Sequence, residues 1–478
     1  MNTTVTLRDF QIEGVNLLKK NEEKYGVGSV LSFQMGLGKT LTMSYFLINQ
    51  RLKELPNEPD LIVVPLCVLT QWRSEMLRLK SNLRIFIYHG PKRVELLKQI
   101  INNVDVVITT YYSFVTRELE LYKWNRVVLD EAHTIRNGVQ NRFKQLPKKV
   151  IGAYAMKSIS KYRHCISGTP YNNRQDDVVS LMTFIGYDCS VTKFIEKFVI
   201  QKSKDDIMDP INTETIMVEN PIGCDLSEYS QIYNLYVRIL AMIQGTRNPV
   251  KLRDLTQQSV KLLARLRLYC DIMAVKNYVI AEEHIDSDDE DDEEEKNPKK
   301  YEEIEFSIED KLRFYNSSIK IREVYNKIEK LIEKVPYKKI IVFSSFVTTI
   351  DILETITNHI NPDIKTFQYI GKKNKAERDL IVEEFTEIDD DDTPMVLFAT
   401  IGSGSCGLNL TPCSTVILVD VSMNPFDEFQ AINRVHRITQ TNQVNVYKFC
   451  MKDMIEEKIH MSHFFKIEDA KSVGLIIS

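Results

Sequence analysis

The sequence contains no apolar run long enough to cross a membrane. None of its stretches approaches the roughly 18 uninterrupted apolar residues that a spanning helix requires. Its first residues, MNTTVTLRDFQIEG, lack the basic-then-apolar pattern of a signal peptide, so we expect a protein that is not secreted. The eight cysteines stand apart, without a C-x-x-C pair, at positions 67, 165, 189, 224, 270, 406, 413 and 450. A disulfide framework and a cysteine-rich zinc site are therefore not expected. We expect the protein to reside in a reducing compartment.

The charge of the chain is unevenly distributed. Over 478 residues, 62 Lys+Arg and 66 Asp+Glu give a formal net charge of −4. Between Glu282 and Glu305 there are 14 acidic and 3 basic residues, so the remainder of the chain has a net charge of +7. A mildly basic remainder permits binding to nucleic acid without requiring it. The acidic run cannot bury apolar area, so we predict that it is disordered.

Short β-branched runs that alternate with helical stretches indicate an α/β fold. The runs lie at 28–33, 61–65, 104–109, 126–129 and 164–166, and again at 339–344, 395–400, 415–419 and 444–449. Because they are apolar on both faces, they are typical of buried parallel strands. The stretch 225–277 has helical spacing of apolar residues instead. We predict α/β lobes at 1–200 and 306–478, separated by a helical insertion at 201–280 and an acidic disordered linker at 281–305.

The segment SFQMGLGKT follows one predicted strand and precedes a helical stretch. Gly36 and Gly38 allow the backbone to turn its amides toward phosphate oxygens. Lys39 can reach the β- and γ-phosphates of ATP, and Thr40 can bind Mg²⁺. The strict phosphate-loop pattern has a glycine where this chain has Phe33. We therefore predict an ATP phosphate site, with a glycine-rich strand-to-helix turn as the alternative.

A second motif, RVVLDEAH, places two carboxylates at the end of a predicted buried strand. Ligands of open parallel sheets bind beyond the C-terminal ends of the strands. Asp130 is predicted to hold Mg²⁺, directly or through water, and Glu131 to polarise the attacking water. The alternative is a helix N-terminus whose acidic residues complement the helix dipole.

A third motif, QAINRVHRITQ, lies far downstream. Arg434 and Arg437 are three residues apart, so we predict that they share one face of a helix. Two guanidinium groups there can stabilise the charge on a transferring γ-phosphoryl group, as an arginine finger does. The alternative is a solvated basic helix.

The order of these motifs resembles a family. The segments LRDFQIEGV, QMGLGKT, PLCVLTQW, DEAH, SGTP, FSSF, GLNLT and QAINRVHRITQ follow one another as in Swi/Snf-type ATPases of superfamily two, which are DNA translocases of chromatin remodelling and transcription. The resemblance covers residues 7–459 and implies two RecA-like lobes. In its compact size the chain is similar to members of the family from large DNA viruses, the global transactivators of baculoviruses among them.

The resemblance also implies roles for individual residues. Gln11 would select adenine, and the phosphate loop would consist of Phe33, Gln34, Met35, Gly36, Leu37, Gly38, Lys39 and Thr40. Ser167 and Thr169 would couple hydrolysis to lobe movement, with His133 as their contact. Gln430 would reach the γ-phosphate together with Arg434 and Arg437. A loop that touches DNA and nucleotide would contain Gly404, Gly407 and Asn409.

The chain departs from the family pattern at several positions. Phe33 and Gln34 stand where the family usually has Asp and Glu, and the segment after SGTP is one residue short. Ser405 replaces a usual glycine, and Met423 replaces a usual tryptophan. None of these changes removes the phosphate-loop lysine, the two carboxylates or the two arginines, so we expect an active ATPase.

Candidate DNA contacts are hydroxyl, amide and basic side chains near strand ends. They are Thr70, Gln71, Trp72, Arg73, Thr109 and Thr110 in the first lobe, and Lys372, Lys373, Lys375 and Arg378 in the second. Contacts of this kind bind the backbone of double-stranded DNA without reading its sequence. By contrast, His460 and His463 are interpreted as surface histidines of a helix, because no further Cys or His completes a metal site.

The leading hypothesis is an ATP- and Mg²⁺-dependent translocase on double-stranded DNA. Nucleosomes and the transcription machinery are its candidate partners, and the nucleus is its expected location. If the protein is viral, that nucleus is the host's, with a cytoplasmic viral factory as the alternative. A strand-separating helicase and a regulatory scaffold without ATPase activity are the competing hypotheses.

Overall fold

The computed structural model describes residues 6–79, 82–135, 147–168, 175–204, 207–221, 223–273, 306–335, 338–387, 393–404 and 410–472. The chain divides into two units, which are treated separately below. The first is formed mainly by Met1–Met208, and the second mainly by Asp209–Asp286 and Pro298–Phe465. Among the described residues, no helix is both long and apolar enough to cross a membrane.

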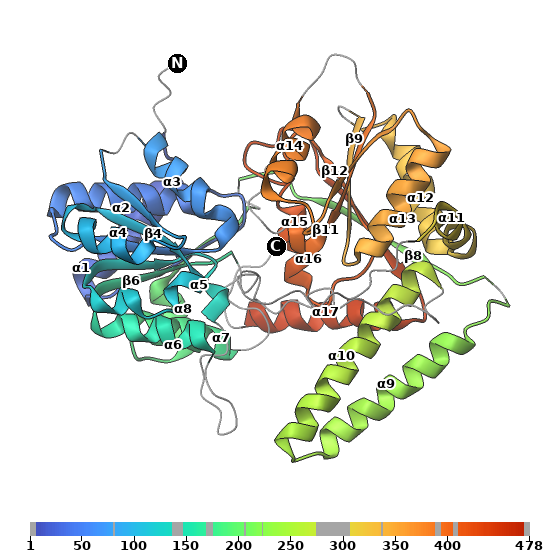
Figure 1. The fold of residues 1–478 in the computed structure, drawn as a ribbon, viewed down its shortest axis with the longest axis horizontal. Helices are drawn as coiled ribbons and strands as arrows, with labels where there is room; N and C mark the ends of the chain where they lie inside the picture. Colours follow the sequence, from blue (N-terminus) through green and yellow to red (C-terminus); the bar gives the residue numbers. More distant parts are fainter. Residues whose placement is uncertain are drawn as a thin grey trace. The chain divides into compact units, whose positions relative to one another are not determined.

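The first unit is built on a seven-stranded parallel sheet (Figure 1). The strand order is β3-β4-β2-β5-β6-β1-β7. Its strands are β1 (Val30–Phe33), β2 (Asp60–Val64), β3 (Ile85–Tyr88), β4 (Val106–Thr110), β5 (Trp124–Leu129), β6 (Ser160–Ile166) and β7 (Val199–Lys202). Its helices are α1 (Asp9–Tyr25), α2 (Lys39–Glu54), α3 (Leu69–Arg78), α4 (Arg93–Ile100), α5 (Tyr111–Phe114), α6 (Lys148–Ala155), α7 (Gln175–Ile185) and α8 (Val191–Phe198). Short 3-10 helices lie at Leu66–Val68, Ile101–Asn103, Glu118–Leu121, Ala132–Ile135 and Met156–Ser158.

The second unit contains a six-stranded parallel sheet with the order β10-β11-β9-β12-β13-β8. Its strands are β8 (Asn212–Val218), β9 (Lys339–Ser344), β10 (Lys365–Tyr369), β11 (Met395–Thr400), β12 (Thr415–Leu418) and β13 (Asn445–Met451). Its helices are α9 (Ser227–Gly245), α10 (Pro249–Ile272), α11 (Ile308–Ser317), α12 (Ile319–Ile332), α13 (Val347–Ile360), α14 (Lys375–Thr386), α15 (Ile401–Gly404), α16 (Pro425–Ile432) and α17 (Ile455–Ser472). The predicted α/β class with two RecA-like parallel-sheet lobes is confirmed.

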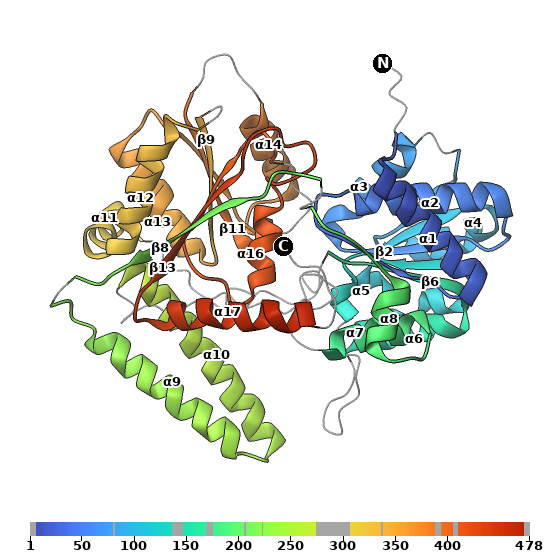
Figure 2. The ribbon, with the colours of Figure 1, turned by 180° about the vertical axis from the view of Figure 1, so that it is seen from behind.

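Helices α9 and α10 lie side by side as a long helical hairpin (Figure 2). Asn248 accepts hydrogen bonds from the amides of Val250 and Lys251 and so begins α10 directly after the turn. The predicted insertion at 201–280 is thus helical in part, but it also contains β8, which pairs with β13 in register over its full length. The predicted acidic linker at 281–305 lies outside the described residues.

The central strands form the core of each lobe, and their burial follows from their composition. β2, β4, β5 and β9 are buried along their entire length. Each of the nine predicted runs overlaps one observed strand. The strands that the prediction missed are β3, β7, β8 and β10, which are the two outer strands of each sheet.

Each lobe also encloses a group of buried charges. In the first lobe, Arg126 donates hydrogen bonds to Glu22 at 2.8 and 2.7 Å, and Glu22 lies 2.8 Å from His164 Nε2. In the second lobe, Lys320 Nζ lies 2.7 Å from Asp271 and 2.7 Å from Glu456, and all three side chains are fully buried. Charges removed from water in this way require such partners, because an unpaired buried charge is strongly destabilising.

Candidate active site

The phosphate loop lies between β1 and α2. Gly36 and Gly38 have φ angles of 86° and 78°, in the left-handed region that favours glycine. A Cβ on Gly38 would lie 2.5 Å from Nε2 of Gln11, so this glycine also allows a close approach. The loop leads directly into the N-terminus of α2, and the backbone amides at a helix N-terminus favour an anion. Lys39 is the first residue of α2, and its ammonium donates to the carbonyl of Phe33 at 3.0 Å.

The two departures within this loop have structural roles. Phe33 is buried and packs edge-to-face against Phe10 of α1, with ring centroids 5.5 Å apart. Its ring leaves room only for a glycine at position 14, where a Cβ would lie 2.7 Å from the ring. The side chain of Gln34 accepts a hydrogen bond from the amide of Lys204 at 2.6 Å. Both side chains therefore point into the lobe and brace it against α1 and the segment after β7.

Gln11, predicted to recognise adenine, is buried in the first turns of α1. Its amide Nε2 donates to the carbonyl of Leu37 at 3.1 Å, and its Oε1 accepts from the amide of Arg8 at 3.0 Å. The side chain thus connects the N-terminus of α1 to the phosphate loop.

Asp130 follows the last residue of β5, and its carboxylate is held on both oxygens. The indole Nε1 of Trp72 donates to Oδ2 at 2.6 Å, and the amide of Glu131 donates to Oδ1 at 2.9 Å. The hydroxyl of Tyr111 donates to the backbone carbonyl of Asp130 at 2.7 Å. Burial, with the neighbouring charge of Glu131, raises the pKa of Asp130 to about 6, although the bond from Trp72 and the charge of Lys39 oppose the shift. A bound cation would favour the charged form.

Glu131 has a backbone conformation that is rare for its residue type. Its φ angle is 48°, and non-glycine residues in this region are concentrated at functional sites. The carboxylate lies 3.3 Å from Nδ1 of His133, and both side chains remain partly exposed. The turn therefore separates the two carboxylates, with Asp130 buried and Glu131 near the surface.

The predicted coupling residue Ser167 directly follows β6, and the next residue, Gly168, packs beside the phosphate loop. Ser167 is fully buried, and its amide donates to the carbonyl of Leu31 at 3.2 Å. A Cβ on Gly168 would lie 2.8 Å from Met35 and 3.1 Å from Nζ of Lys39, so this glycine packs directly on the loop. Thr169 lies outside the described residues.

In the second lobe, the prediction that both arginines share a helix face is wrong. α16 ends at Ile432, and Arg434 and Arg437 lie in the turns that follow it. The amide of Arg434 donates to the carbonyl of Ala431, three residues earlier, as in a tight turn. The carbonyl of Arg434 accepts a hydrogen bond from the amide of Leu410. Contacts with the segment around Leu410 thus override the helical spacing of the sequence.

The two guanidinium groups nevertheless act on each other. Arg434 is buried, and Arg437 is half-buried. Burial lowers the pKa of Arg437 to about 10, and the charge of Arg434 contributes to the decrease. Two like charges held close together in a partly desolvated site favour an anionic ligand.

The remaining second-lobe candidates are described only in part. Gln430 is half-buried in α16, in the last turn before the arginines. Gly404 ends α15, while Gly407 and Asn409 lie outside the described residues.

The candidate DNA contacts range from exposed to buried side chains, and Lys373 and Arg378 are half-buried. On α3, Thr70, Gln71 and Arg73 are exposed, as is Lys372 in the second lobe. The side chains that the structure buries instead are Trp72, Thr109 and Thr110. Thr109 donates to the carbonyl of Tyr88, and Thr110 caps α5, so these three are excluded as surface contacts.

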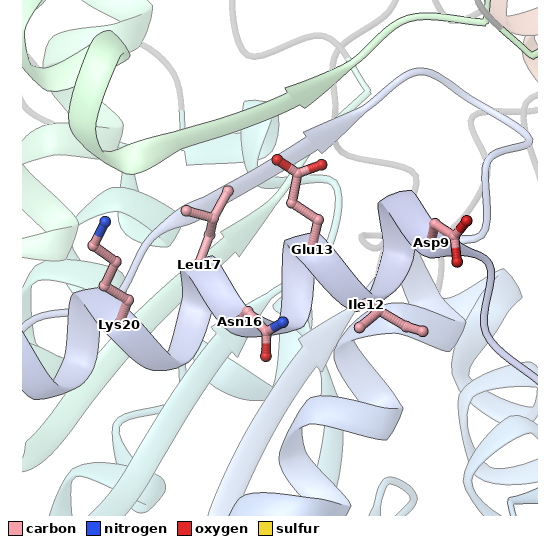
Figure 3. A pocket seen from close by; sticks show the side chains of 6 residues that line it. All are labelled: Asp9, Ile12, Glu13, Asn16, Leu17 and Lys20. Carbon is pink, nitrogen blue, oxygen red and sulfur yellow. The ribbon is translucent and has the colours of Figure 1, made fainter.

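His463 is also not a surface residue, contrary to its interpretation from the sequence. It is buried in α17, and its Nε2 lies 2.8 Å from the carbonyl of Ser422. His460 is half-exposed. A hollow on α1 is lined by Asp9, Ile12, Glu13, Asn16, Leu17 and Lys20, and none of these is a predicted site residue (Figure 3).

The donors near the phosphate loop are chemically suited to Mg²⁺. Thr40 lies in the first turn of α2, and Asp130 directly follows β5. Within the described ranges, no group of three or more His, Cys, Asp or Glu side chains could hold a metal. Mg²⁺ usually takes one or two carboxylates and completes its shell with phosphates and water. Thr40 and Asp130 therefore fit an ion that arrives with a nucleotide.

A glycine-rich strand-to-helix turn and two carboxylates at one edge of a parallel sheet are typical of phosphate-loop ATPases. Comparison with known proteins defines the group more closely. Residues 10–212 match the SNF2-related domain, and residues 323–439 match the helicase conserved C-terminal domain. The chain therefore has the domain pair of a Swi2/Snf2-type helicase-like ATPase.

Curated relatives extend over nearly the whole chain. It is 28% identical to the ISWI chromatin-remodeling complex ATPase ISW2 of Saccharomyces cerevisiae, over 95% of this chain and 39% of that protein. It is 25% identical to the ATP-dependent helicase FUN30 of the same yeast, over 96% and 46% of the two chains. It is 27% identical to the putative ATP-dependent helicase/translocase YwqA of Bacillus subtilis, over 95% and 47%. The chain thus spans less than half the length of these relatives.

Among solved structures, the chain is similar to the Sulfolobus solfataricus SWI2/SNF2 ATPase core in complex with dsDNA. The sequence identity is 24%, the TM-score is 0.41, and the match covers 99% of this chain and 94% of the other.

Proposed function

We propose that this protein hydrolyses ATP in order to move along double-stranded DNA. The observation that carries the proposal is the edge of the first sheet, where the phosphate loop, Lys39, Asp130 and Glu131 follow the ends of β1 and β5. The match to both domains of a Swi2/Snf2-type ATPase supports it.

Each of these residues has a distinct role in the proposed reaction. The amides of the loop and Lys39 bind the phosphates, and Glu131 orients the attacking water. Mg²⁺, held by Thr40 and Asp130, would neutralise charge on the β- and γ-phosphates. Arg434 and Arg437 stabilise the charge on the transferring group, with Gln430 beside them.

The exposed side chains of α3 are the proposed DNA contacts of the first lobe. Thr70, Gln71 and Arg73 can bind phosphates through hydroxyl, amide and guanidinium groups. Lys372 supplies an exposed cation in the second lobe. Contacts of this type give salt-dependent affinity without sequence preference. Alternating contact by two such lobes would produce directional movement.

The proposal extends to the setting of the protein. Chromatin is the inferred substrate, with nucleosomes or transcription complexes as partners and the nucleus as the location. The basis is that two of the curated relatives above are yeast proteins, and one of them is named as a chromatin-remodelling ATPase. A viral origin stays a prediction.

Two other functions remain to be separated by experiment. A strand-separating helicase would use the same ATP site. A scaffold without ATPase activity is disfavoured, because Phe33 and Gln34 point into the lobe and leave Lys39, Asp130 and Glu131 unchanged.

The test is to compare ATP hydrolysis without DNA, with single-stranded DNA, with duplex DNA and with nucleosomes. Duplex DNA should stimulate turnover more than single strands do, and strand displacement should be absent. Equal stimulation by single strands together with displacement would establish the helicase instead. ATP binding without turnover under every condition would establish the scaffold.

A further inference from the structure

Helix α3 has two faces with different surroundings. Thr70, Gln71 and Arg73 are exposed on one side. Trp72 is fully buried on the other, and its indole reaches the carboxylate of Asp130 at 2.6 Å. A single helix of ten residues, Leu69–Arg78, therefore joins the proposed DNA surface to the proposed metal ligand.

The bond from Trp72 fixes one specific atom of the site. The amide of Glu131 holds Oδ1 of Asp130, and this bond forms within the same turn. The indole holds Oδ2 and comes from an element 58 residues earlier in the chain. A displacement of α3 would therefore act on Oδ2, whereas Oδ1 is held within its own turn.

We propose that Trp72 is a positioning residue through which duplex DNA on the exposed face of α3 adjusts the Asp130 carboxylate. This inference rests on the proposed function and names how DNA would stimulate hydrolysis. Groups that orient a metal ligand commonly change metal affinity or activity by about 10- to 100-fold when removed. A catalytic carboxylate must also be held to within about 0.5 Å, so a small shift of α3 is sufficient.

The chain contains a matched control for this residue. It has two tryptophans, Trp72 and Trp124, and both are buried in the first lobe. Trp124 begins β5, at the end opposite Asp130, and its Nε1 donates to the carbonyl of Leu119 at 3.0 Å. Each indole thus makes one buried hydrogen bond, but only that of Trp72 involves the site.

The first experiment uses Trp72 as its own reporter. In Trp124→Phe, tryptophan emission comes from Trp72 alone, and saturating duplex DNA should shift or quench it. In Trp72→Phe, the emission of Trp124 should not change on addition of the same DNA. Adding Arg73→Ala to Trp124→Phe should move the change to higher DNA concentration. Emission from Trp72 that stays constant while DNA binds would overturn the inference.

The second experiment measures hydrolysis by the full chain. Trp72→Phe keeps an aromatic ring but loses the N–H donor, so turnover with DNA should fall by about 10- to 100-fold. The Mg²⁺ concentration for half-maximal turnover should rise, while the KM for ATP stays near that of the unmodified protein. Trp124→Phe should change none of these, which separates positioning from a general loss of stability.

The outcomes distinguish the two proposals. An unmodified protein whose hydrolysis is indifferent to DNA would overturn the proposed function together with the role of Trp72. Stimulation by DNA that is equal in Trp72→Phe and Trp124→Phe would overturn the role of Trp72 alone. If Trp72→Phe fails to fold, the emission of Trp72 in Trp124→Phe still decides the question.

Discussion

The two lobes use the same edge of their parallel sheets in different ways. In the first lobe, the strand ends lead into the phosphate loop and into Asp130 and Glu131. In the second lobe, β9 ends at Ser344 and β12 leads to Asp420, and the Ser344 hydroxyl donates to the Asp420 carboxylate at 2.6 Å. Arg267 of α10 adds a bond to Asp420 at 3.1 Å.

Buried ionic contacts join several helices at this edge of the second lobe. Asp420 and the neighbouring Lys320 group hold α10, α12 and α17 against the sheet, so this edge serves packing. Arg434 and Arg437 lie in the turns that follow α16. Ligands of parallel sheets bind at the C-terminal edge, but whether a ligand can bind there depends on the side chains at that edge.

The largest effect should come from the second-lobe arginines. Arg434→Ala and Arg437→Ala should each lower turnover by about 10³- to 10⁵-fold in the best case, because an arginine finger acts on transition-state charge. ATP affinity should change little. Single-turnover hydrolysis and nucleotide binding measure the two quantities. Arg313→Ala, at a side chain that is 78% exposed, is the control. Lost ATP binding with normal turnover per bound ATP would contradict the role.

The first-lobe edge should respond in the complementary way. Glu131→Gln should bind ATP and lower turnover by about 10²- to 10⁴-fold, because it loses the group that orients water. Lys39→Ala should lose ATP affinity as well, since it removes a cation from the phosphates. Equilibrium binding and steady-state hydrolysis check both, with Glu13→Gln on the exposed face of α1 as the control. Unchanged turnover in either variant would contradict the assignment.

The second-lobe edge should instead be sensitive in stability. Lys320→Met leaves Asp271 and Glu456 buried without their cation, which should lower the free energy of unfolding by about 3 to 5 kcal/mol. Lys330→Met, exposed on the same helix, should stay within about 0.5 kcal/mol. Denaturant unfolding measures both, and ATP binding by the first lobe should persist. A loss of ATP affinity in Lys320→Met under native conditions would break the contrast between the two edges.

The sequence predicts the interior of each sheet better than its margins. Central strands such as β2 and β9 are apolar on both faces, so their runs identify them directly. Each outer strand has only one neighbouring strand. Three of them carry polar residues, namely β7 (VIQK), β8 (NTETIMV) and β10 (KTFQY), whereas β3 (IFIY) is short and apolar. Their pairing depends on partners far along the chain, and no local pattern records it.

The site follows the same division. The turn at Gly36 and Gly38 is a local property, and the residue types alone predict it. The bond from Trp72 to Asp130 joins two motifs, and the end of α16 before Arg434 depends on a contact with Leu410. The sequence could indicate that Trp72 is important, since an indole follows a strand end, but not which atom it contacts.

The smallest predicted effect is on the pH dependence of stability, and it concerns the buried Glu22 group of the first lobe. The hydrogen bond with His164 and that with Arg126 hold the pKa of Glu22 below 4.5, although burial opposes them. The amide of Ser29 donates to Nδ1 of His164, so Nε2 carries the proton and a neutral imidazole suffices. A lowered carboxyl pKa stabilises the fold above about pH 4.5, and the contribution is lost as pH falls through the lowered value.

Glu22→Gln should therefore lower the free energy of unfolding at pH 7 by about 2 to 3 kcal/mol, because Arg126 keeps its contact with Glu54. The difference from the unmodified protein should shrink as the pH falls below about 4.5. Denaturant unfolding from pH 3 to pH 7 measures it, with Glu23→Gln on the exposed side of α1 as the control. Arg126 lies in the first half of β5, whereas Asp130 follows the other end of this strand, so the KM for ATP should not change. A destabilisation that is equal at every pH would show that Glu22 contributes through packing rather than through its charge.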